Sequence, residues 1–401
     1  MTRKILPYAI VVLFAYIGFS LPLPILPEMF LDPARSIVPG LSLKGKMIAL
    51  GFMMASFPCG QFFGAPIIGH LSDIYGRKKI ILYSLSGTTL GYLITAYCVS
   101  LRNFPGMFFG LVLCGFCEGN VTIGQSVVVD IAEHPEQKAR HFGLLNAFIS
   151  LGFIIGPLMG GQLANSSLVP WFTFATPFWT AAGMTILGIL VIYFGSSETL
   201  RNKKKAGWDF LSSIIKGFKY PKMPRLYAAN FFLALGYFSF FRFLPVFLKE
   251  RFSFDPSYLS FVMVYGSLMM IVSVLWIVPC LAKRFLPDRI LAAFAFFFAL
   301  SVILCLLPAS PFALWVTIPL TGVCLAVTIT NGSLLISNAA TLEFQGQALG
   351  TLTSIQVLAE AVTGFLGGLI AAELETLPLL IGAAMSCLCS IILIRNRIKY
   401  V

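Results

Sequence analysis

The chain has 401 residues, of which 58% are hydrophobic and only 11% are charged. Soluble domains average about 25% charged residues, so these side chains cannot cover the surface of a water-soluble protein of this length. The composition therefore excludes a soluble enzyme, a disordered protein and a nucleic-acid-binding domain, although the net charge is +12.

Apolar runs recur along the chain at the length that a membrane-spanning helix requires, which is about 20 residues. They cover residues 6–27, 47–70, 79–99, 105–130, 142–165, 170–195, 226–248, 258–282, 290–309, 312–337, 349–372 and 377–394. We therefore predict an all-α polytopic membrane protein with twelve transmembrane helices. The first run continues to about residue 30 without a cleavage pattern of small residues, so we interpret it as a first span and not as a signal peptide.

One long polar stretch, residues 197–225, divides these spans into two sets of six. It predicts an N-terminal six-helix bundle at 1–196, a cytoplasmic linker at 197–225 and a C-terminal six-helix bundle at 226–401. Most of the 28 Lys and Arg residues fall in this linker and in the other segments on the same side of the membrane. Since basic residues accumulate on the cytoplasmic side, both termini are predicted to be cytoplasmic, and the short loops favour a bacterial inner (plasma) membrane.

Residues 143–164 and 350–371 align without gaps, which indicates that the two halves repeat one plan. Their identical positions are Gly143/Gly350, Leu145/Leu352, Leu151/Leu358, Gly160/Gly367, Gly161/Gly368 and Ala164/Ala371. Transporters use such paired bundles to enclose a site near the middle of the membrane. We therefore expect the two bundles to be pseudo-symmetric.

The segment after the second span reads Gly69-His-Leu-Ser-Asp73-Ile-Tyr-Gly76-Arg77-Lys78-Lys79. One helix ends beside an acid, a glycine permits a tight turn, and a basic cluster opens the next helix. The segment resembles the G-x-L-a-D-r-x-G-r-k loop of the major facilitator superfamily, with matches that include Gly69, Asp73, Gly76, Arg77 and Lys78. The resemblance implies that this loop acts as a cytoplasmic latch that stabilises the outward-facing state.

A second motif lies in the fifth span and reads Gly152-Phe-Ile-Ile-Gly156-Pro157-Leu-Met-Gly160-Gly161. It resembles the g-x-x-x-G-P-x-x-G-G motif of the antiporter branches of the same superfamily. Small residues allow helices to approach closely, and Pro157 frees a backbone carbonyl and bends its helix. The resemblance favours antiport, and with it export of a small organic compound.

The first span resembles that of the twelve-span drug–proton antiporter branch through Gly18, Pro24 and Pro27. Two positions depart from the branch. Ala15 stands where the first span often has an acid, and Leu111 stands where the fourth span usually has an arginine. Because both are missing, proton coupling in this chain requires other ionisable residues.

Three charged residues lie well inside the apolar runs, namely Glu118, Glu360 and Arg242. A charge at the bilayer centre costs at least about 2.5–3.5 kcal/mol on insertion scales, so such residues usually face the bundle interior or a water-filled cavity. We predict that they carry the proton or bind the substrate. The alternatives are a protonated Glu118 satisfied by a neighbouring helix and an Arg242 that is the structural partner of one of the acids. Asp130, near the end of its span, is expected to make a structural contact at a helix end.

Further polar residues are predicted to line the central cavity that the family forms from its first, fourth, seventh and tenth spans. In the fourth span, Thr122 continues a stripe with Gly115, Glu118 and Gly119 at helical spacing. The other candidates are Tyr237, Asn331 and Gln356. For Asn331, a role in packing alone is an equal alternative.

The predicted function is secondary active transport of a small organic solute by alternating access, in the form of proton-coupled efflux. Uptake by symport and exchange without protons remain alternatives because of Ala15 and Leu111, and a non-transporting membrane receptor is a remote one. No catalytic cluster of a membrane enzyme is recognisable, and the nine cysteines show no metal-ligand spacing. We expect no cofactor, metal or nucleic acid, and a monomer in the lipid bilayer that takes a small-molecule substrate and uses the proton gradient.

Overall fold

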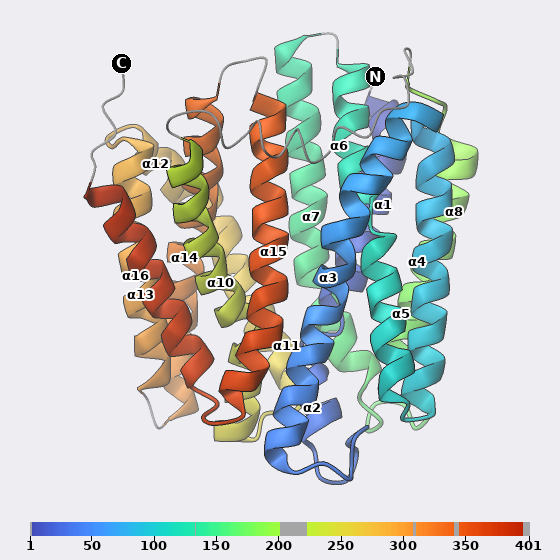
Figure 1. The fold of residues 1–401 in the computed structure, drawn as a ribbon, viewed down its shortest axis with the longest axis vertical. Helices are drawn as coiled ribbons and strands as arrows, with labels where there is room; N and C mark the ends of the chain where they lie inside the picture. The colour runs from blue at the N-terminus through green and yellow to red at the C-terminus, as the bar shows by residue number, and fades with distance from the viewer. Residues whose placement is uncertain (1, 133, 201–222, 308–309, 341–344, 396–401) are drawn as a thin grey trace. The chain divides into compact units, whose positions relative to one another are not determined.

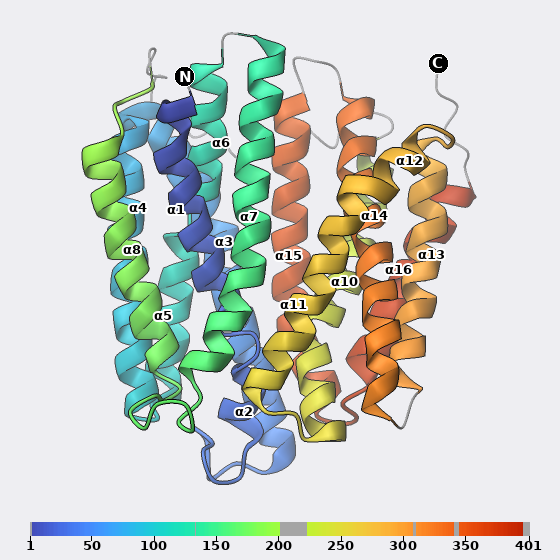
Figure 2. The same cartoon turned by 180° about the vertical axis from the view of Figure 1, so that it is seen from behind.

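The computed structural model describes residues 2–132, 134–200, 223–307, 310–340 and 345–395, and their regular structure is entirely helical (Figures 1 and 2). Eleven helical segments of the described residues are long and apolar enough to cross a membrane. The shorter apolar helix Lys4–Ser20 precedes them. With that helix they account for the twelve predicted spans, and the prediction of an all-α polytopic membrane fold is confirmed.

The helices of the first half follow the predicted apolar runs, with one short additional helix after the first span. They are α1 (Thr2–Ser20), α2 (Leu26–Leu31), α3 (Leu43–Tyr75), α4 (Arg77–Ser100), α5 (Phe104–Phe116), α6 (Asn120–Ile131), α7 (Pro135–Leu163) and α8 (Thr176–Gly195). Prolines open several of them, as expected because a residue at the first turn needs no backbone N–H.

The second half repeats this series. Its helices are α10 (Met223–Phe252), α11 (Pro256–Val272), the π-turn η1 (Ser273–Ile277), α12 (Val278–Ala282), α13 (Pro287–Leu306), the 3-10 turn η2 (Pro311–Ala313), α14 (Leu314–Ala339), α15 (Gln345–Ala371) and α16 (Leu377–Ile394). The greater part of the predicted linker, residues 201–222, lies outside the described residues.

The chain divides into two compact units. One comprises Met1–Ser42, Phe52–Trp208 and Asp255–Val264, and the other comprises Leu43–Gly51, Asp209–Phe254 and Tyr265–Val401. In the first unit α1 packs against α6, α7 and α8, and α4 packs against α5 and α8. In the second unit α10 packs against α14, α15 and α16, and α13 packs against α14 and α16. The same helix pairs therefore recur in both units, as the sequence repeat predicts.

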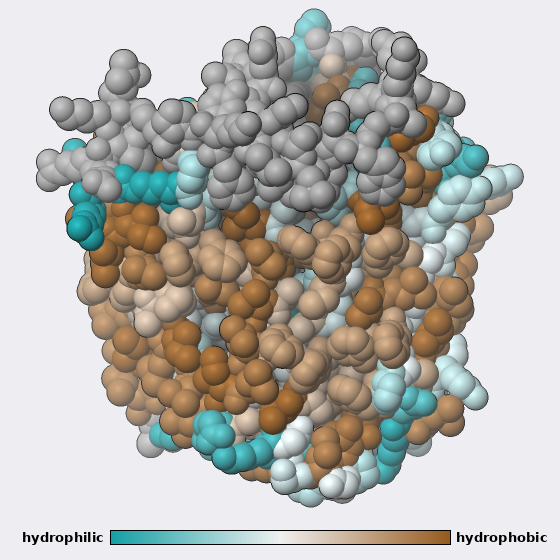
Figure 3. All heavy atoms as spheres, in the orientation of Figure 1, coloured by the Kyte–Doolittle hydropathy of each residue, from teal (hydrophilic) through white to brown (hydrophobic). Residues whose placement is uncertain are grey.

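The outer faces of the helices are apolar. Large side chains such as Phe194 and Phe312 are 79% and 78% exposed, respectively. In Figure 3 hydrophobic side chains cover most of the visible surface, and hydrophilic ones gather toward the helix ends. Such continuous apolar surface exceeds what soluble monomers expose, and in a lipid environment it needs no further burial.

Two of the predicted spans are not continuous α-helices. The eighth contains the π-turn η1, where the N–H of Val278 donates to the carbonyl of Ser273, five residues earlier. Pro279 follows at the start of α12, and it has no backbone N–H to donate to the preceding turn. The fourth span is interrupted at Cys117–Gly119, between α5 and α6, where Gly119 directly follows Glu118 and Gly115 precedes it by three residues, and both weaken the helix.

The glycines of the predicted antiporter motif hold α7 close to α1. The peptide carbonyl of Gly152 accepts a hydrogen bond of 3.1 Å from the Ser20 hydroxyl of α1. A methyl group added at Gly156 would meet Ser20, and one at Gly160 would meet the backbone carbonyl of Leu21. Gly161 faces a different helix, α11, through Pro256 and Ser260, which belong to the same unit.

In the second half, Gly367, which matches Gly160, also allows two helices to approach closely. A methyl group at Gly367 of α15 would meet the ring of Phe243 on α10. The matched glycines thus contact the first span of their own half, Gly160 at Leu21 directly after α1 and Gly367 at Phe243 within α10. The sequence identity reflects a shared requirement for close helix packing.

We predict that Gly160→Ala lowers the thermal stability of the purified protein, because its new methyl group meets the Leu21 backbone and forces α7 away from α1. Overpacking of this kind costs about 1–3 kcal/mol. Gly143→Ala in the same helix is the matched control, since a methyl group there meets nothing within 4 Å. Unfolding in detergent, followed by tryptophan fluorescence, should show a lower midpoint for Gly160→Ala alone; equal midpoints would contradict the assigned contact.

Candidate functional site

The predicted latch motif spans the junction between α3 and α4. Gly76 joins the two helices with a backbone φ of 107°, a conformation that favours glycine. Arg77 therefore opens α4 directly after α3 ends at Tyr75. The tight junction brings the acid of one helix and the base of the next within reach of each other.

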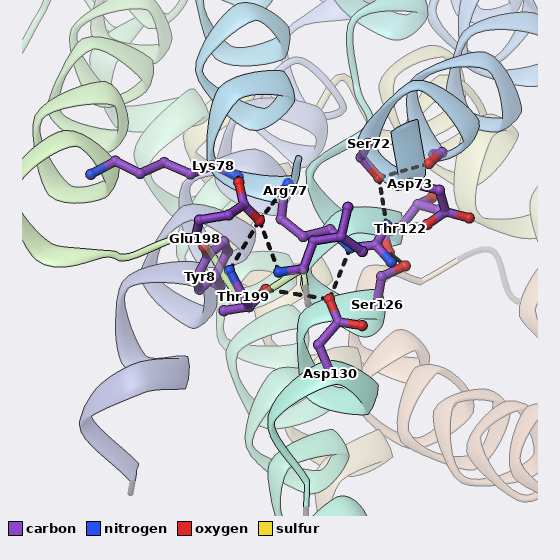
Figure 4. A network of polar contacts seen from close by, with 12 residues as sticks. Tyr8, Ser72, Asp73, Arg77, Lys78, Thr122, Ser126, Asp130, Glu198 and Thr199 are labelled. Atoms are coloured by element: carbon purple, nitrogen blue, oxygen red, sulfur yellow. Dashed lines mark hydrogen bonds and ion pairs between the residues drawn. The ribbon is translucent and has the colours of Figure 1, made fainter. Parts of the chain in front are cut away.

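Arg77 is 6% exposed and contacts three side chains at this junction (Figure 4). Its Nη1 atom lies 2.5 Å from Oδ1 of Asp73 and donates to the Ser72 hydroxyl at 2.7 Å. Its Nε atom donates to Oδ2 of Asp130 on α6 at 3.0 Å. Two carboxylates therefore compensate the buried guanidinium, and the contact expected for Asp130 at a helix end is with Arg77.

Glu198 and Lys78 cap the helix ends beside this cluster. The Glu198 carboxylate accepts the backbone N–H groups of Arg77 at 2.9 Å and of Lys78 at 3.2 Å, at the N-terminus of α4. The Lys78 ammonium donates to the carbonyls of Tyr193 and Ser196 at 2.8 and 2.7 Å, at the end of α8. Each charge has the sign that the helix dipole favours at its position.

Thr199 extends the network to the segment that follows α8. Its hydroxyl donates to Oδ2 of Asp130 at 3.3 Å, the same oxygen that Arg77 contacts (Figure 4). The cluster formed by Ser72, Asp73, Arg77, Lys78, Asp130, Glu198 and Thr199, called the junction cluster below, thus ties the ends of α3, α4, α6 and α8 together. The sequence interpretation missed Glu198 and Thr199, which fall at the start of the predicted linker. An available signal was that an acid directly follows the sixth span and could cap the start of another helix.

Glu118 lies in the interruption of the fourth span, near the midpoint of the segment Phe104–Ile131. It is 4% exposed, and its Oε1 atom accepts a hydrogen bond of 3.1 Å from the side-chain amide of Asn120. Its other oxygen, Oε2, has no hydrogen-bond partner among the described residues. The predicted polar stripe of Gly115, Glu118, Gly119 and Thr122 assumed a continuous helix. Because the helix is broken at Cys117–Gly119, helical spacing no longer relates Glu118 to Thr122.

Arg242 and Glu360 form a buried ion pair in the second unit. Nη2 of Arg242 on α10 contacts Oε1 of Glu360 on α15, and their side chains are 5% and 6% exposed. Glu360 lies near the midpoint of the span Ala348–Ala371. The structure thus joins two of the three charged residues that the sequence singled out.

The remaining candidates occupy separate places. Thr122 on α6 is half-buried, and Gly69 of α3 faces its methyl group. Asn331 is 1% exposed and donates to the carbonyl of Val327 in its own helix at 2.9 Å. Tyr237 is 6% exposed on α10, and Gln356 is half-buried one turn before Glu360 on α15. A cavity-lining role for these four stays a prediction.

No group of three or more His, Cys, Asp or Glu side chains that could hold a metal ion occurs within the described ranges. The charged side chains described above near mid-span are the carboxyl groups of Glu118 and Glu360 and the guanidinium group of Arg242. Such groups bind protons, ions and polar solutes, and in membrane proteins they mark transport pathways.

A polytopic helical protein with ionisable groups at the middle of its spans has the construction of a membrane transporter. The chain belongs to the Major Facilitator Superfamily, whose sequence profile matches residues 8–316. Members of this family are transporters of small molecules and not enzymes, and in general they need no cofactor.

Several known proteins share part of this sequence. The tetracycline resistance protein of class H from Pasteurella multocida is 30% identical over 194 residues, which cover 48% of this chain and 44% of that protein. The major facilitator superfamily domain-containing protein 10 from Bos taurus is 28% identical over 343 residues, covering 78% of this chain and 70% of that protein. The chain thus spans less than half of the length of the tetracycline resistance protein that it matches.

Solved structures share the fold over nearly the whole chain. The crystal structure of the human organic anion transporter MFSD10 (TETRAN) superposes with a TM-score of 0.71 at 21% identity, covering 98% of both chains. A D-xylose–proton symporter superposes with a TM-score of 0.78 at 13% identity, covering 99% of this chain and 97% of that one. At these identities the likeness shows the fold.

We predict that Arg242→Gln and Glu360→Gln each destabilise the protein, whereas the double variant is more stable than either. Removing one partner of a buried ion pair leaves an uncompensated charge and costs about 3–5 kcal/mol, but removing both leaves none. Unfolding midpoints of the three variants in detergent test this. If the stability loss of the double variant equals the sum of the losses of the two single variants, a direct interaction between Arg242 and Glu360 is contradicted.

Proposed function

We propose that the protein is a proton-coupled antiporter that exports a small organic solute. The observation that carries the proposal is the placement of Glu118 and Glu360, two carboxyl groups buried near the midpoints of their spans. Neither is needed to cap a helix, and burial of a carboxylate is costly unless it is paired or protonated. Groups of this kind can take up a proton from one side and release it to the other.

The Arg242–Glu360 pair favours an anionic or zwitterionic substrate. A substrate carboxylate can replace Glu360 as the partner of the guanidinium, which binds carboxylates in a bidentate manner. Protonation of Glu360 would remove its charge and leave Arg242 available to the substrate. The names of the relatives, tetracycline resistance proteins and an organic anion transporter, agree with a polar, ionisable solute.

The junction cluster is the proposed cytoplasmic latch. It joins the ends of four helices through charges that must separate or move if these ends move apart. In this proposal the cluster stabilises the outward-facing state. The proposed topology has two six-helix bundles, at 1–196 and 226–401, joined by a linker at 197–225. The linker and both termini lie on the cytoplasmic side in this proposal. The protein would be a monomer in the inner membrane of a bacterium.

Symport or exchange without protons is the second candidate, because Ala15 and Leu111 replace the ionisable residues of the antiporter branch. Flux in inside-out membrane vesicles separates the three modes. Acidification of the vesicle lumen should drive the solute inward for an antiporter. The opposite gradient should do so for a symporter, and neither gradient should for an exchanger.

We predict that Glu118→Gln and Glu360→Gln each reduce pH-gradient-driven flux at least about tenfold. Glutamine at position 118 cannot release a proton, and glutamine at position 360 removes the carboxylate that a substrate would replace beside Arg242. Purified protein in liposomes would be tested with tetracycline and with p-aminohippurate, a small organic anion. Glu373→Gln is the matched control, since Glu373 is an exposed acid paired with Lys44. Wild-type flux in both buried-acid variants would show that this assignment is wrong.

A further inference from the structure

The proposed proton coupling leaves open which buried acid binds the transported proton. Glu118 and Glu360 differ in what surrounds them. Glu360 contacts the guanidinium of Arg242, so its charge is compensated while it is ionised. Glu118 takes part in none of the ion pairs formed by the described residues.

The described residues of its own unit that surround Glu118 supply no positive charge. The titratable side chains near it are Tyr92 of α4, Cys114 of α5 and Cys117 at the break, and all three are neutral when protonated. Ile68 of α3 packs against Gly119. Asp130, the acid of α6, lies about three turns beyond Glu118 and contacts Arg77. An ionised Glu118 would therefore be an uncompensated charge at membrane depth.

The break itself fixes the position of the carboxyl group. The Ser84 hydroxyl of α4 contacts the Cys117 carbonyl and accepts the N–H of Gly119 at 3.4 Å, so it replaces bonds that a continuous helix would make. Asn120, 1% exposed at the first position of α6, donates to Oε1 of Glu118. This arrangement leaves Oε2 as the oxygen without a partner among the residues that the structure describes.

From this geometry we infer that Glu118 is the residue that binds the transported proton, that Oε2 is the oxygen that holds it, and that Asn120 is a positioning residue that sets how tightly it is held. The inference rests on the proposed function, because it names the proton-binding group of the same transport cycle. The Arg242–Glu360 pair is left to the substrate. The amide of Asn120 stabilises the ionised form of Glu118, so its removal makes the proton harder to release.

The test is a pH titration of the purified protein in lipid, followed by infrared difference spectroscopy of the carbonyl band of protonated carboxyl groups. We expect a protonated buried carboxyl in the wild type that disappears in Glu118→Gln and remains in Glu360→Gln. In Asn120→Ala the midpoint of this band should move to higher pH by about one unit, the size expected for one hydrogen bond to a charged group.

Asn230→Ala is the matched control, because Asn230 is 3% exposed and its amide donates to the Leu226 carbonyl of its own helix. It should leave the midpoint unchanged. A band that persists in Glu118→Gln, or an unchanged midpoint in Asn120→Ala, would overturn the inference; if Asn120→Ala does not fold, the Glu118→Gln spectrum decides alone. The titration measures proton binding and not transport, so the two proposals can fail separately. If Glu118 titrates as expected but the protein shows no pH-driven flux, the proposed function is wrong and the assignment of the proton-binding residue stands.

Discussion

The cost of placing charge in a medium of low dielectric constant governs how this chain uses its ionisable residues. Each charge must face water, meet an opposite charge or a helix end, or be neutralised by a proton. Arg242 and Glu360 satisfy the requirement together, and Arg77 satisfies it with two carboxylates. Among the described residues, the partner of Glu118 is an amide and not a charged group. The same physical constraint therefore separates structural pairs from a group suited to proton transfer.

The two settings also imply different responses during transport. In the junction cluster every charge contacts either an opposite charge or the backbone groups of a helix end. Such contacts stabilise one arrangement of the helix ends. If the helix ends move apart, these charged groups need new partners or water. In the proposed cycle the groups at mid-span instead exchange ligands, the proton and the solute. Alternating access requires both kinds of site, a set of contacts that distinguishes states and a group whose occupancy changes.

The sequence predicted the helical fold, its number of spans and the internal repeat, because hydropathy and helix length are local properties. It also located Glu118, Glu360 and Arg242, since charges in apolar runs are conspicuous. The interruption at Cys117 was not predicted, because it depends on the Ser84 hydroxyl of a neighbouring helix. The capping role of Glu198 was missed for a similar reason: the N–H group that it accepts belongs to Arg77, far away in the sequence. The spacing of residues along the chain predicts which side chains are neighbours within one helix. Contacts between helices cannot be read from spacing, because they depend on how the helices pack.

If the binding of solute and the binding of a proton are coupled, each must change the affinity for the other by the same factor, even when they bind to different residues. The most direct measurement is therefore the release of protons when solute binds to the purified protein in a weakly buffered solution. With p-aminohippurate or tetracycline as the solute, the proposed antiport predicts release of about one proton per bound solute. That release should be absent in Glu118→Gln even though the solute still binds. Binding of the solute to the wild type without any proton release would contradict proton-coupled antiport.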